Sequence, residues 1–243
     1  MKPGSGVTNI NNATPSCRSW TLPPSKTNSC VFPLALAGRP TISNVNNMQH
    51  WKILGLFIMQ DLQGSIILAA PNMLDDNFAK TVVYIASVEE GDGVLGFVIN
   101  RPTNLSLLDI ADQLGVEAVE PNASALVYRG GPVGNQHGFV LHTPDYEDMQ
   151  TLRNHQRGLN MSNSLEVMRA IAKGQGPERF RLMLGYAGWG DGQLEEEIRR
   201  HDWLTVPFDL DDVFSSEGEA LWEQLLGKLN IDLAGYSEMG GSA

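Results

Sequence analysis

Residues 179–203, RFRLMLGYAGWGDGQLEEEIRRHDW, predict a strand that turns directly into a helix. Large apolar residues occupy every second position of the first half, at Phe180, Leu182, Leu184 and Tyr186. This period of two is that of a strand with one larger apolar face. The glycines at positions 188, 190 and 192 permit backbone angles that are closed to other residues, so the turn can be completed within a few residues.

The helix that follows is expected to begin at Asp191, whose carboxylate would accept hydrogen bonds from the first free amides. Leu194 and Ile198 form its inward stripe. Two Glu to Arg pairs are spaced four residues apart in the favourable order, a spacing worth roughly 0.2–0.5 kcal/mol for each pair. These predicted pairs are Glu195 with Arg199 and Glu196 with Arg200.

Glu197 and His201 are also four residues apart, but they border the apolar stripe instead of facing away from it. A partly buried carboxylate and imidazole could act as an acid–base pair. A simple ion pair beside Trp203 is the alternative and the more common arrangement. Both interpretations stay open at this point.

The composition indicates a soluble globular protein, with 42% hydrophobic and 19% charged residues in a chain of 243. Residues 1–58 contain five Lys or Arg and no acid, so residues 59–243 hold 12 basic and all 28 acidic residues. The net charge of the later part is therefore -16, which repels a nucleic-acid backbone. We expect an acidic cytoplasmic protein that does not bind nucleic acid directly.

Residues 1–58 are rich in Asn, Ser, Thr, Pro and Gly and show no sustained period, so we expect a disordered leader or misassigned upstream sequence. A transit peptide would place the protein in a plastid or another organelle. Translation from Met59 is the other interpretation, and the one we favour. Cys17 and Cys30 both lie in this segment, which leaves the rest of the chain without a thiol. The apolar run Ile53–Met59 is much shorter than the roughly 20 residues that span a bilayer, so no membrane association is expected.

Residues 59–234 are expected to form one α+β domain with a mixed, largely antiparallel sheet flanked by helices, and residues 235–243 a frayed tail. The strands include a hairpin from Thr81 to the residues before Pro102, and two strands around a Gly-Pro loop at positions 130–132. Helices are expected after three capping signals: Ser106, Asn163 with Glu166, and Ser216 with Glu219.

Four motifs in the order found here resemble the AlgH (YqgE) family: GSIILAAPNMLDDNF, NRPTNLSL, GGPVGNQHGFVLH and GYAGWGDGQLEEEI. The resemblance extends from Gln63 to about Phe214, and Asp191 stands where the family often has proline. It implies a single-domain α+β fold found widely in bacteria, with plastid relatives. Members are often labelled transcriptional regulators, without an established biochemical activity. A helix-turn-helix with a basic recognition helix is not readable in this sequence.

The motifs contain few groups of clear chemical purpose. The segment GGPVGNQHG invites a phosphate-binding interpretation, but Pro132 removes one amide that such a loop would use, and a tight turn between strands is favoured. His137 and His142 would point to opposite faces of a strand, so we predict no metal site and no cofactor. Arg101 and Arg129 each follow a predicted strand and could bind a carboxylate or phosphate. Pairing with Asp or Glu is the favoured alternative for both.

We therefore predict a non-enzymatic protein that binds a small ligand or a protein partner in a cleft where the NRP, GGPV and GWGDGQLE motifs meet. The predicted binding residues are Asn100, Arg101, Pro102, Gly130, Gly131, Pro132, His142, Gly188, Trp189, Gln193 and Glu197. One alternative is an unrecognised hydrolase or transferase with Glu197 or His142 as general base. A second alternative is transcriptional regulation without direct DNA contact.

Overall fold

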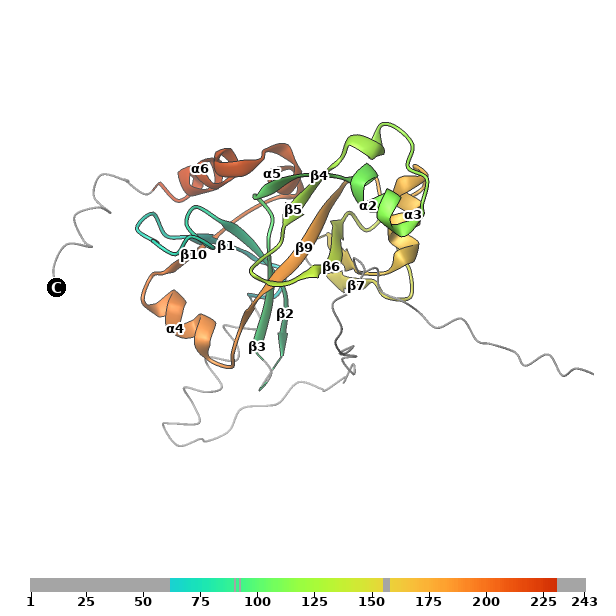
Figure 1. Cartoon of the computed structure of the whole chain (residues 1–243). Helices are drawn as coiled ribbons and strands as arrows, with labels where there is room; N and C mark the ends of the chain where they lie inside the picture. The colour runs from blue at the N-terminus through green and yellow to red at the C-terminus, as the bar shows by residue number, and fades with distance from the viewer. Residues whose placement is uncertain (1–61, 90, 92, 155–157, 231–243) are drawn as a thin grey trace, which may run out of the picture.

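The computed structural model describes residues 62–89, 91, 93–154 and 158–230 (Figure 1). The predicted leader and tail lie outside the described residues. The strands are β1 (Ile66–Ala69), β2 (Val82–Glu89), β3 (Gly93–Val98), β4 (Pro102–Ser106), β5 (Leu126–Arg129), β6 (Val133–His142), β7 (Leu152–Asn154), β8 (Leu159–Ser162), β9 (Phe180–Trp189) and β10 (Trp203–Val206). The helices are α2 (Leu107–Leu114), η1 (Asn122–Ser124), α3 (Leu165–Ala172), α4 (Gln193–Arg199), α5 (Leu210–Ser215) and α6 (Gly218–Lys228).

Strand β9 is the strand that joins the two parts of the sheet. The strand order within the described residues is β10-β1-β2-β3-β9-β6-β8-β7. The second half of β9 pairs with β3, and its first half pairs with β5 and β6. Every pairing is antiparallel except that of β5 with β9. The predicted α+β class and the largely antiparallel, mixed sheet are confirmed, and so is the hairpin, which is formed by β2 and β3.

The segment between β5 and β6 crosses β9 instead of forming a turn between neighbouring strands. Leu184 of β9 pairs with Arg129 of β5 in parallel and with Gly138 of β6 in antiparallel, so the two strands lie on opposite edges of β9. The predicted short connection between two strands is present, because only three residues separate β5 from β6, but the strands that it joins are not neighbours in the sheet. Sequence proximity favoured a hairpin, but the later strand β9 is inserted between the two.

The crossing depends on the absence of side chains at Gly130 and Gly131. A Cβ atom on Gly131 would lie 2.1 Å from the carbonyl carbon of Tyr186 and 2.5 Å from the amide nitrogen of Ala187. A Cβ atom on Gly130 would lie 2.3 Å from the carbonyl oxygen of Gly185. These are backbone atoms of β9 that cannot move aside, so the two chains are in direct contact at this point.

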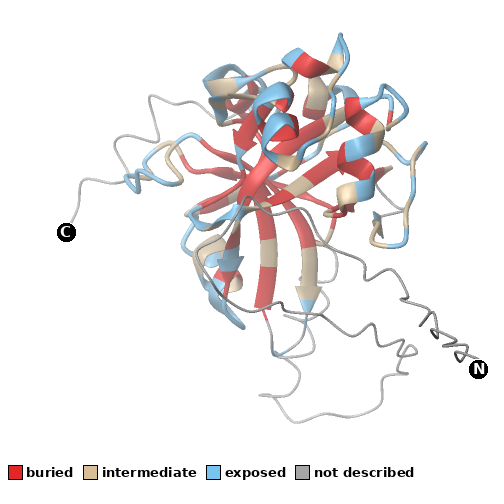
Figure 2. Ribbon diagram, turned by 45° about the vertical axis from the view of Figure 1, so that its right-hand side comes forward, coloured by how far each residue is buried: buried red, intermediate tan, exposed pale blue. Residues whose placement is uncertain are grey.

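The sheet around β1–β3 is covered on both faces, as the alternation of buried side chains requires (Figure 2). Helices α5 and α6 cover one face, where Trp222 also donates a 2.8 Å hydrogen bond from Nε1 to the carbonyl of Ala69. Helix α4 and residue Phe78 cover the other face. One face carries Ile66, Leu68, Val82 and Tyr84, and the other carries Ile67, Ala69, Val83 and Ile85.

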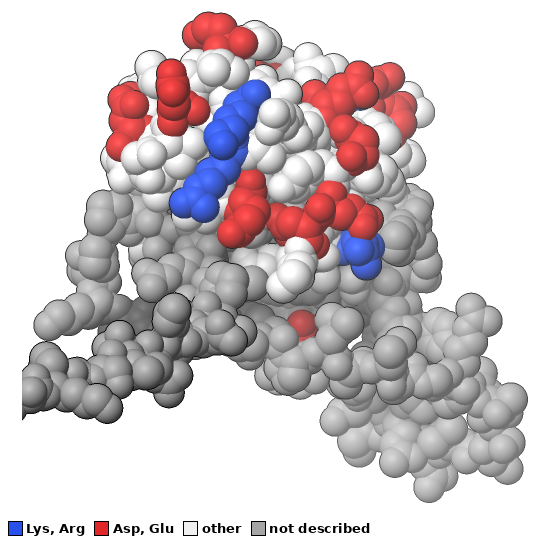
Figure 3. Space-filling view, turned by 90° about the vertical axis from the view of Figure 1, so that its right-hand side faces the viewer, with Lys and Arg blue, Asp and Glu red and all other residues white. Residues whose placement is uncertain are grey.

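Helices α2 and α3 pack on the other part of the sheet and form a third apolar cluster with β5, β6 and β9. Viewed from this side, the molecule shows acidic patches on both sides of a short basic stripe (Figure 3). No helix in the described ranges has the length and apolar character needed to cross a bilayer.

The helix starts agree with the sequence prediction in one case of four. Ser106 caps α2 in a reciprocal box with Asp109, as predicted, and Gly115 ends the helix in the left-handed conformation. The start of α3 was predicted wrongly, because Ser164, not Asn163, accepts the hydrogen bond from the backbone. The hydroxyl of Ser164 is better placed because the helix begins one residue later than predicted.

The start of α4 also differs from the prediction, because the N-cap is Gly192, with φ 75°, and not Asp191. A left-handed N-cap suits glycine, which has no Cβ to clash. The predicted capping box of Ser216 with Glu219 is absent as well, since the Ser216 hydroxyl donates to Gln224 instead. An additional short helix, α5, precedes that point, and Asp209 caps it.

Replacing Gly131 with Ala should destabilise the protein by at least about 3 kcal/mol, because the new methyl group meets main-chain atoms that cannot retreat. The matched control is Gly227→Ala in α6, where a Cβ meets nothing within 4 Å and a gain of about 0.5–1 kcal/mol is expected. Urea unfolding followed by circular dichroism measures both. Equal stability of the Gly131→Ala variant and the parent protein would show that the crossing is not tight.

Candidate functional site

A surface pocket of about 390 Å³ opens where the end of β3, the start of β4, the end of β5 and the first turn of α6 meet. Its volume lies in the range of small-molecule sites, roughly 300–1,000 Å³. We call it the arginine pocket. Its lining residues are Ala79, Lys80, Asn100, Arg101, Pro102, Thr103, Arg129, Gly218 and Glu219.

Asn100 holds the base of the arginine pocket together. The residue is 2% exposed, and its Oδ1 accepts a 2.8 Å hydrogen bond from the amide of Val82. Its Nδ2 donates to the carbonyls of Lys80 at 3.0 Å and Gly218 at 2.9 Å. The side chain therefore joins the start of β2 to the start of α6. Its hydrogen-bonding groups are all engaged within the protein.

Arg101 and Arg129 project into the pocket without a carboxylate partner. Nη1 of Arg101 donates to the carbonyl of Asp76 at 2.8 Å, and Nη2 donates to that of Ala79 at 3.0 Å. Nη2 of Arg129 donates to Oδ1 of Asn77 at 3.3 Å. Within the described part of the chain, neither guanidinium has an Asp or Glu oxygen within 4.0 Å. The expectation that each arginine pairs with a carboxylate was therefore wrong.

The electrostatics of Arg101 reflect its partial burial and its neighbour. Burial lowers the pKa of Arg101, and the positive charge of Arg129 lowers it further. Asp75 and Asp76 act in the opposite direction. Burial and the charge of Arg129 both disfavour the charged form of Arg101. An anion bound by the two guanidinium groups would favour that charged form.

Lys80 adds a third cation, held by an exposed ion pair. Its Nζ lies 2.8 Å from Oε2 of Glu219, and the two side chains are 48% and 65% exposed. The hydrogen bond and the charge of Glu219 raise the pKa of Lys80. Lys80 also has φ 56°, a left-handed conformation that is uncommon for a residue with a Cβ. An exposed pair of this kind contributes little to stability and exchanges readily.

Glu197 is the acceptor at the centre of a second group of residues, which we call the tryptophan cluster. Its Oε2 accepts hydrogen bonds from the Nε1 atoms of Trp189 and Trp203, each at 2.8 Å. Its Oε1 accepts from Nε2 of Gln193 at 2.8 Å. His201 is exposed, and no hydrogen bond or ion pair in the described residues joins it to Glu197. The carboxylate thus anchors two buried indoles to α4.

The exposed charges of α4 also pair differently from the prediction. Arg199 contacts Glu196 three residues away, at 2.6 Å, instead of Glu195. Arg200 contacts Asp202 at 3.0 Å instead of Glu196. Arg200 is the C-cap of α4 and lies beside Asp202, which is only two residues away in the turn that follows.

The segment 75–79 links the arginine pocket to the tryptophan cluster. Its carbonyls at Asp76 and Ala79 accept hydrogen bonds from the pocket arginine Arg101. The ring of Phe78, between these two residues, lies 6.2 Å from the ring of Trp189 and 5.5 Å from that of Trp203. The NRP and GWGDGQLE motifs therefore contact the same short segment, through Arg101 and Trp189.

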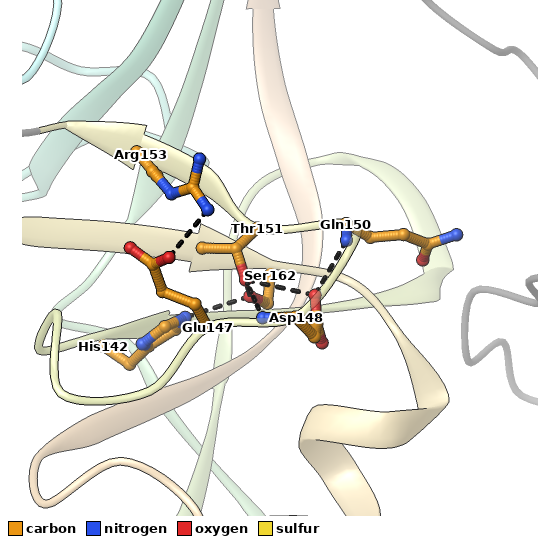
Figure 4. Close-up of polar contacts among 7 residues, drawn as sticks. All are labelled: His142, Glu147, Asp148, Gln150, Thr151, Arg153 and Ser162. Carbon is orange, nitrogen blue, oxygen red and sulfur yellow. Dashed lines mark hydrogen bonds and ion pairs between the residues drawn. The ribbon is translucent and has the colours of Figure 1, made fainter.

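His142 lies apart from both groups, at the buried end of β6 (Figure 4). It is 0% exposed, its Nδ1 lies 2.8 Å from the carbonyl of Thr143, and its Nε2 lies 3.0 Å from the hydroxyl of Ser162. The carbonyl can only accept, so Nδ1 carries the proton and Nε2 accepts from Ser162 in the neutral ring. The network continues through the hydroxyl of Thr151 to the carboxylate of Asp148.

The remaining predicted residues lie along the crossing and on β9. Gly130 and Gly131 are buried against β9, and Pro132 and Gly188 are exposed. The lining of the arginine pocket includes Asn100, Arg101 and Pro102 of the predicted set. It does not include the tryptophan cluster, the crossing glycines or His142.

Comparison with known proteins identifies the family. Residues 66–234 match the family model described as AlgH-like. The chain belongs to the AlgH family. A UPF0301 protein of Burkholderia vietnamiensis is 43% identical to it over 188 residues, which cover 75% of this chain and 96% of the relative. A UPF0301 protein of Burkholderia multivorans is 42% identical with the same coverage.

Solved structures of AlgH-like proteins support the fold. The solution structure of the AlgH protein from Pseudomonas aeruginosa is 38% identical, with a TM-score of 0.60, and the match covers 75% of this chain and 94% of that one. A crystal structure of a Corynebacterium diphtheriae protein, 24% identical with a TM-score of 0.56, shares the fold over 72% of this chain and 91% of its own length.

Sequence reasoning missed five lining residues of the arginine pocket in this AlgH-family chain, which include Ala79 and Thr103. Lys80, Gly218 and Glu219 were not predicted, and Lys80 and Glu219 are 139 residues apart in the sequence. A pairing over such a distance leaves no local signal. The partners of His142 were also missed. The described residues contain no group of three or more His, Cys, Asp or Glu arranged to hold a metal ion.

Replacing Glu197 with Gln should lower the free energy of unfolding by about 1–3 kcal/mol. Glu197 now accepts hydrogen bonds from two indoles and from the side-chain amide of Gln193. The NH2 group of the new glutamine would face at least one of these donors without an acceptor. The control Glu196→Gln, on the exposed side of α4, should change stability by less than about 0.5 kcal/mol. Urea unfolding followed by tryptophan fluorescence compares the two. Similar values for both variants would contradict the anchoring role.

His142 should make the AlgH-family protein less stable as the pH falls below about 6.5, the ordinary pKa of histidine. Burial is the main cause that lowers the pKa of His142, while the bond to Thr143 and the charges of Asp148, Asp145 and Glu147 raise it. The unfolded chain therefore binds the proton more readily than the folded one, so stability is full at neutral pH and declines toward pH 5.

The variant His142→Asn tests this dependence, because Asn does not titrate. Its free energy of unfolding should change less between pH 7 and pH 5.5 than that of the parent protein, in urea titrations at each pH. Parallel pH profiles for the two proteins would show that another group is responsible.

Proposed function

We propose that this AlgH-family protein binds a small ligand in the arginine pocket and acts through binding, without catalysing a reaction. The observation that carries the proposal is the pair Arg101 and Arg129, which line a pocket of about 390 Å³ and have no carboxylate partner among the residues that the structure describes. Polar groups of this kind on the wall of a concave site give a ligand its orientation.

The proposed site is narrower than the cleft predicted from the motifs. In the proposal, the NRP motif and Arg129 contact the ligand, while the GGPV and GWGDGQLE motifs build the framework. The tryptophan cluster supports the segment 75–79 through Phe78, and that segment in turn holds Arg101. Asn100 positions the pocket walls through its three hydrogen bonds.

The enzymatic alternative has less support. Glu197 already accepts three hydrogen bonds, and His142 is 0% exposed in its own network. Neither residue lines the arginine pocket. A general base must reach the proton that it abstracts, and neither group is placed to reach a ligand in this pocket.

Direct DNA binding also has less support than ligand binding. On the side of the molecule that carries α2 and α3, acidic patches outnumber basic ones (Figure 3), and the whole chain has a net charge of -11. A regulatory role is compatible with the proposal where the bound ligand or a protein partner carries the signal. We propose that the protein acts in the cytoplasm, because its acidic composition suits a cytoplasmic protein.

A thermal-shift screen of the full-length protein against uncharged, anionic and cationic metabolites tests the proposal. A ligand that binds the folded state raises the melting temperature by mass action. The variant Pro102→Trp places a large side chain at an exposed position of the pocket wall, and Asn104→Trp places it elsewhere on β4. Stabilisation should disappear in Pro102→Trp and persist in Asn104→Trp. Hits that stabilise both variants equally would refute binding in the pocket.

A further inference from the structure

We infer that the ligand of the arginine pocket carries a dianionic phosphate group, held between Arg101, Arg129 and Lys80. The inference rests on the proposed function and names the class of ligand. It depends on the local charge, on the lack of carboxylate partners for the two arginines among the described residues, and on the exposed position of Glu219.

The pocket concentrates positive charge in an acidic protein. It contains three of the 12 basic residues that follow residue 58, and one acidic residue, Glu219. The formal charge of its lining is therefore +2, whereas residues 59–243 together have a charge of -16. A phosphate monoester carries a charge of about -1.5 to -2 at pH 7, which matches the lining.

Arg101 and Arg129 both line the pocket, and the charge of each acts on the other. The charge of Arg129 is the second cause, after burial, that lowers the pKa of Arg101. The partners of the arginines are neutral: two main-chain carbonyls and the side-chain oxygen of Asn77. A phosphate adds the attraction between opposite charges and can bind a guanidinium through two parallel hydrogen bonds, so an entering phosphate can compete with these neutral partners.

The wall opposite the arginines also suits an anion. Gly218 and Glu219 begin the eleven-residue helix α6, and the side chain of its N-cap, Glu217, forms no capping hydrogen bond. The first amides of α6 therefore have no side-chain acceptor, and the helix dipole places partial positive charge at this end. This contribution is secondary to that of the arginines.

Glu219 pairs with Lys80 at the position where the anionic group of the ligand would bind. Nζ of Lys80 lies 2.8 Å from Oε2 of Glu219. The Glu219 side chain is 65% exposed, so it can turn away into solvent. A phosphate that reaches Lys80 must displace this internal competitor. Removal of the Glu219 charge should therefore strengthen phosphate binding, whereas removal of the Arg129 charge should weaken it.

The size of the pocket favours a small molecule over a nucleic acid. A volume of about 390 Å³ holds a small metabolite, and the acidic body of the protein would repel a long polyanion. Three separate cationic side chains also favour a phosphate over a single carboxylate, because a phosphate offers more acceptor oxygens.

Isothermal titration of the full-length protein with inorganic phosphate and with glycerol 3-phosphate tests the inference, with glycerol and succinate as comparison compounds. Arg129→Gln should weaken phosphate binding about tenfold or more, since it removes a charge-assisted hydrogen bond. Glu219→Gln should strengthen it by roughly threefold. Arg169→Gln and Glu166→Gln on α3 make the same changes of charge outside the pocket lining and should change affinity by much less.

The inference is overturned if neither phosphate compound binds at up to about 10 mM, if glycerol binds as well as glycerol 3-phosphate, or if Glu219→Gln weakens binding. It is also overturned if succinate binds as tightly as the phosphates. The proposed function is judged separately, by the response of any hit to Pro102→Trp and Asn104→Trp. Binding of an uncharged metabolite that only Pro102→Trp abolishes would keep the pocket and reject the phosphate.

Discussion

The direct backbone contact between Gly130–Gly131 and strand β9 is the constraint on which the rest of the structure depends. It lets the chain pass from β5 on one edge of β9 to β6 on the other within three residues. Both halves of the sheet are thereby attached to one ten-residue strand. The contact also places Arg129, the last residue of β5, beside the end of β3, because the carbonyl of Gly130 accepts a hydrogen bond from Val98. The arginine pocket is formed at this junction.

The segment 75–79 gives the protein a physical link between its pocket and its buried aromatic core. Its turn is closed by hydrogen bonds from the amides of Phe78 and Ala79 to the carbonyl of Asp75. It is held by the pocket arginines and by the packing of Phe78 on Trp189 and Trp203. Glu197 secures the two indoles against which Phe78 packs. The pocket arginines and the tryptophan cluster thus contact the same short segment. The glycine-rich GWGDGQLE motif, read as a possible binding rim, supports this core.

Family membership fixes the fold of this chain more firmly than its activity. The relatives named above share the architecture over most of their length, and their names describe no reaction. The chemistry therefore has to be argued from the site itself. In this chain the decisive groups are two arginines, which lack carboxylate partners within the described ranges, and Glu219, which pairs with Lys80.

The sequence by itself determined the α+β class, the alternation of β9, the hairpin of β2 and β3, and the cap of α2, because these depend on neighbours within a few residues. It also singled out Asn100, Arg101 and Arg129, since charged and amide groups after strands are visible as local patterns. Only the tertiary structure decided that β9 lies between β5 and β6, that Glu219 faces Lys80, and that Glu197 binds two indoles. These contacts join segments whose separation along the chain carries no periodic signal, so only packing could bring them together.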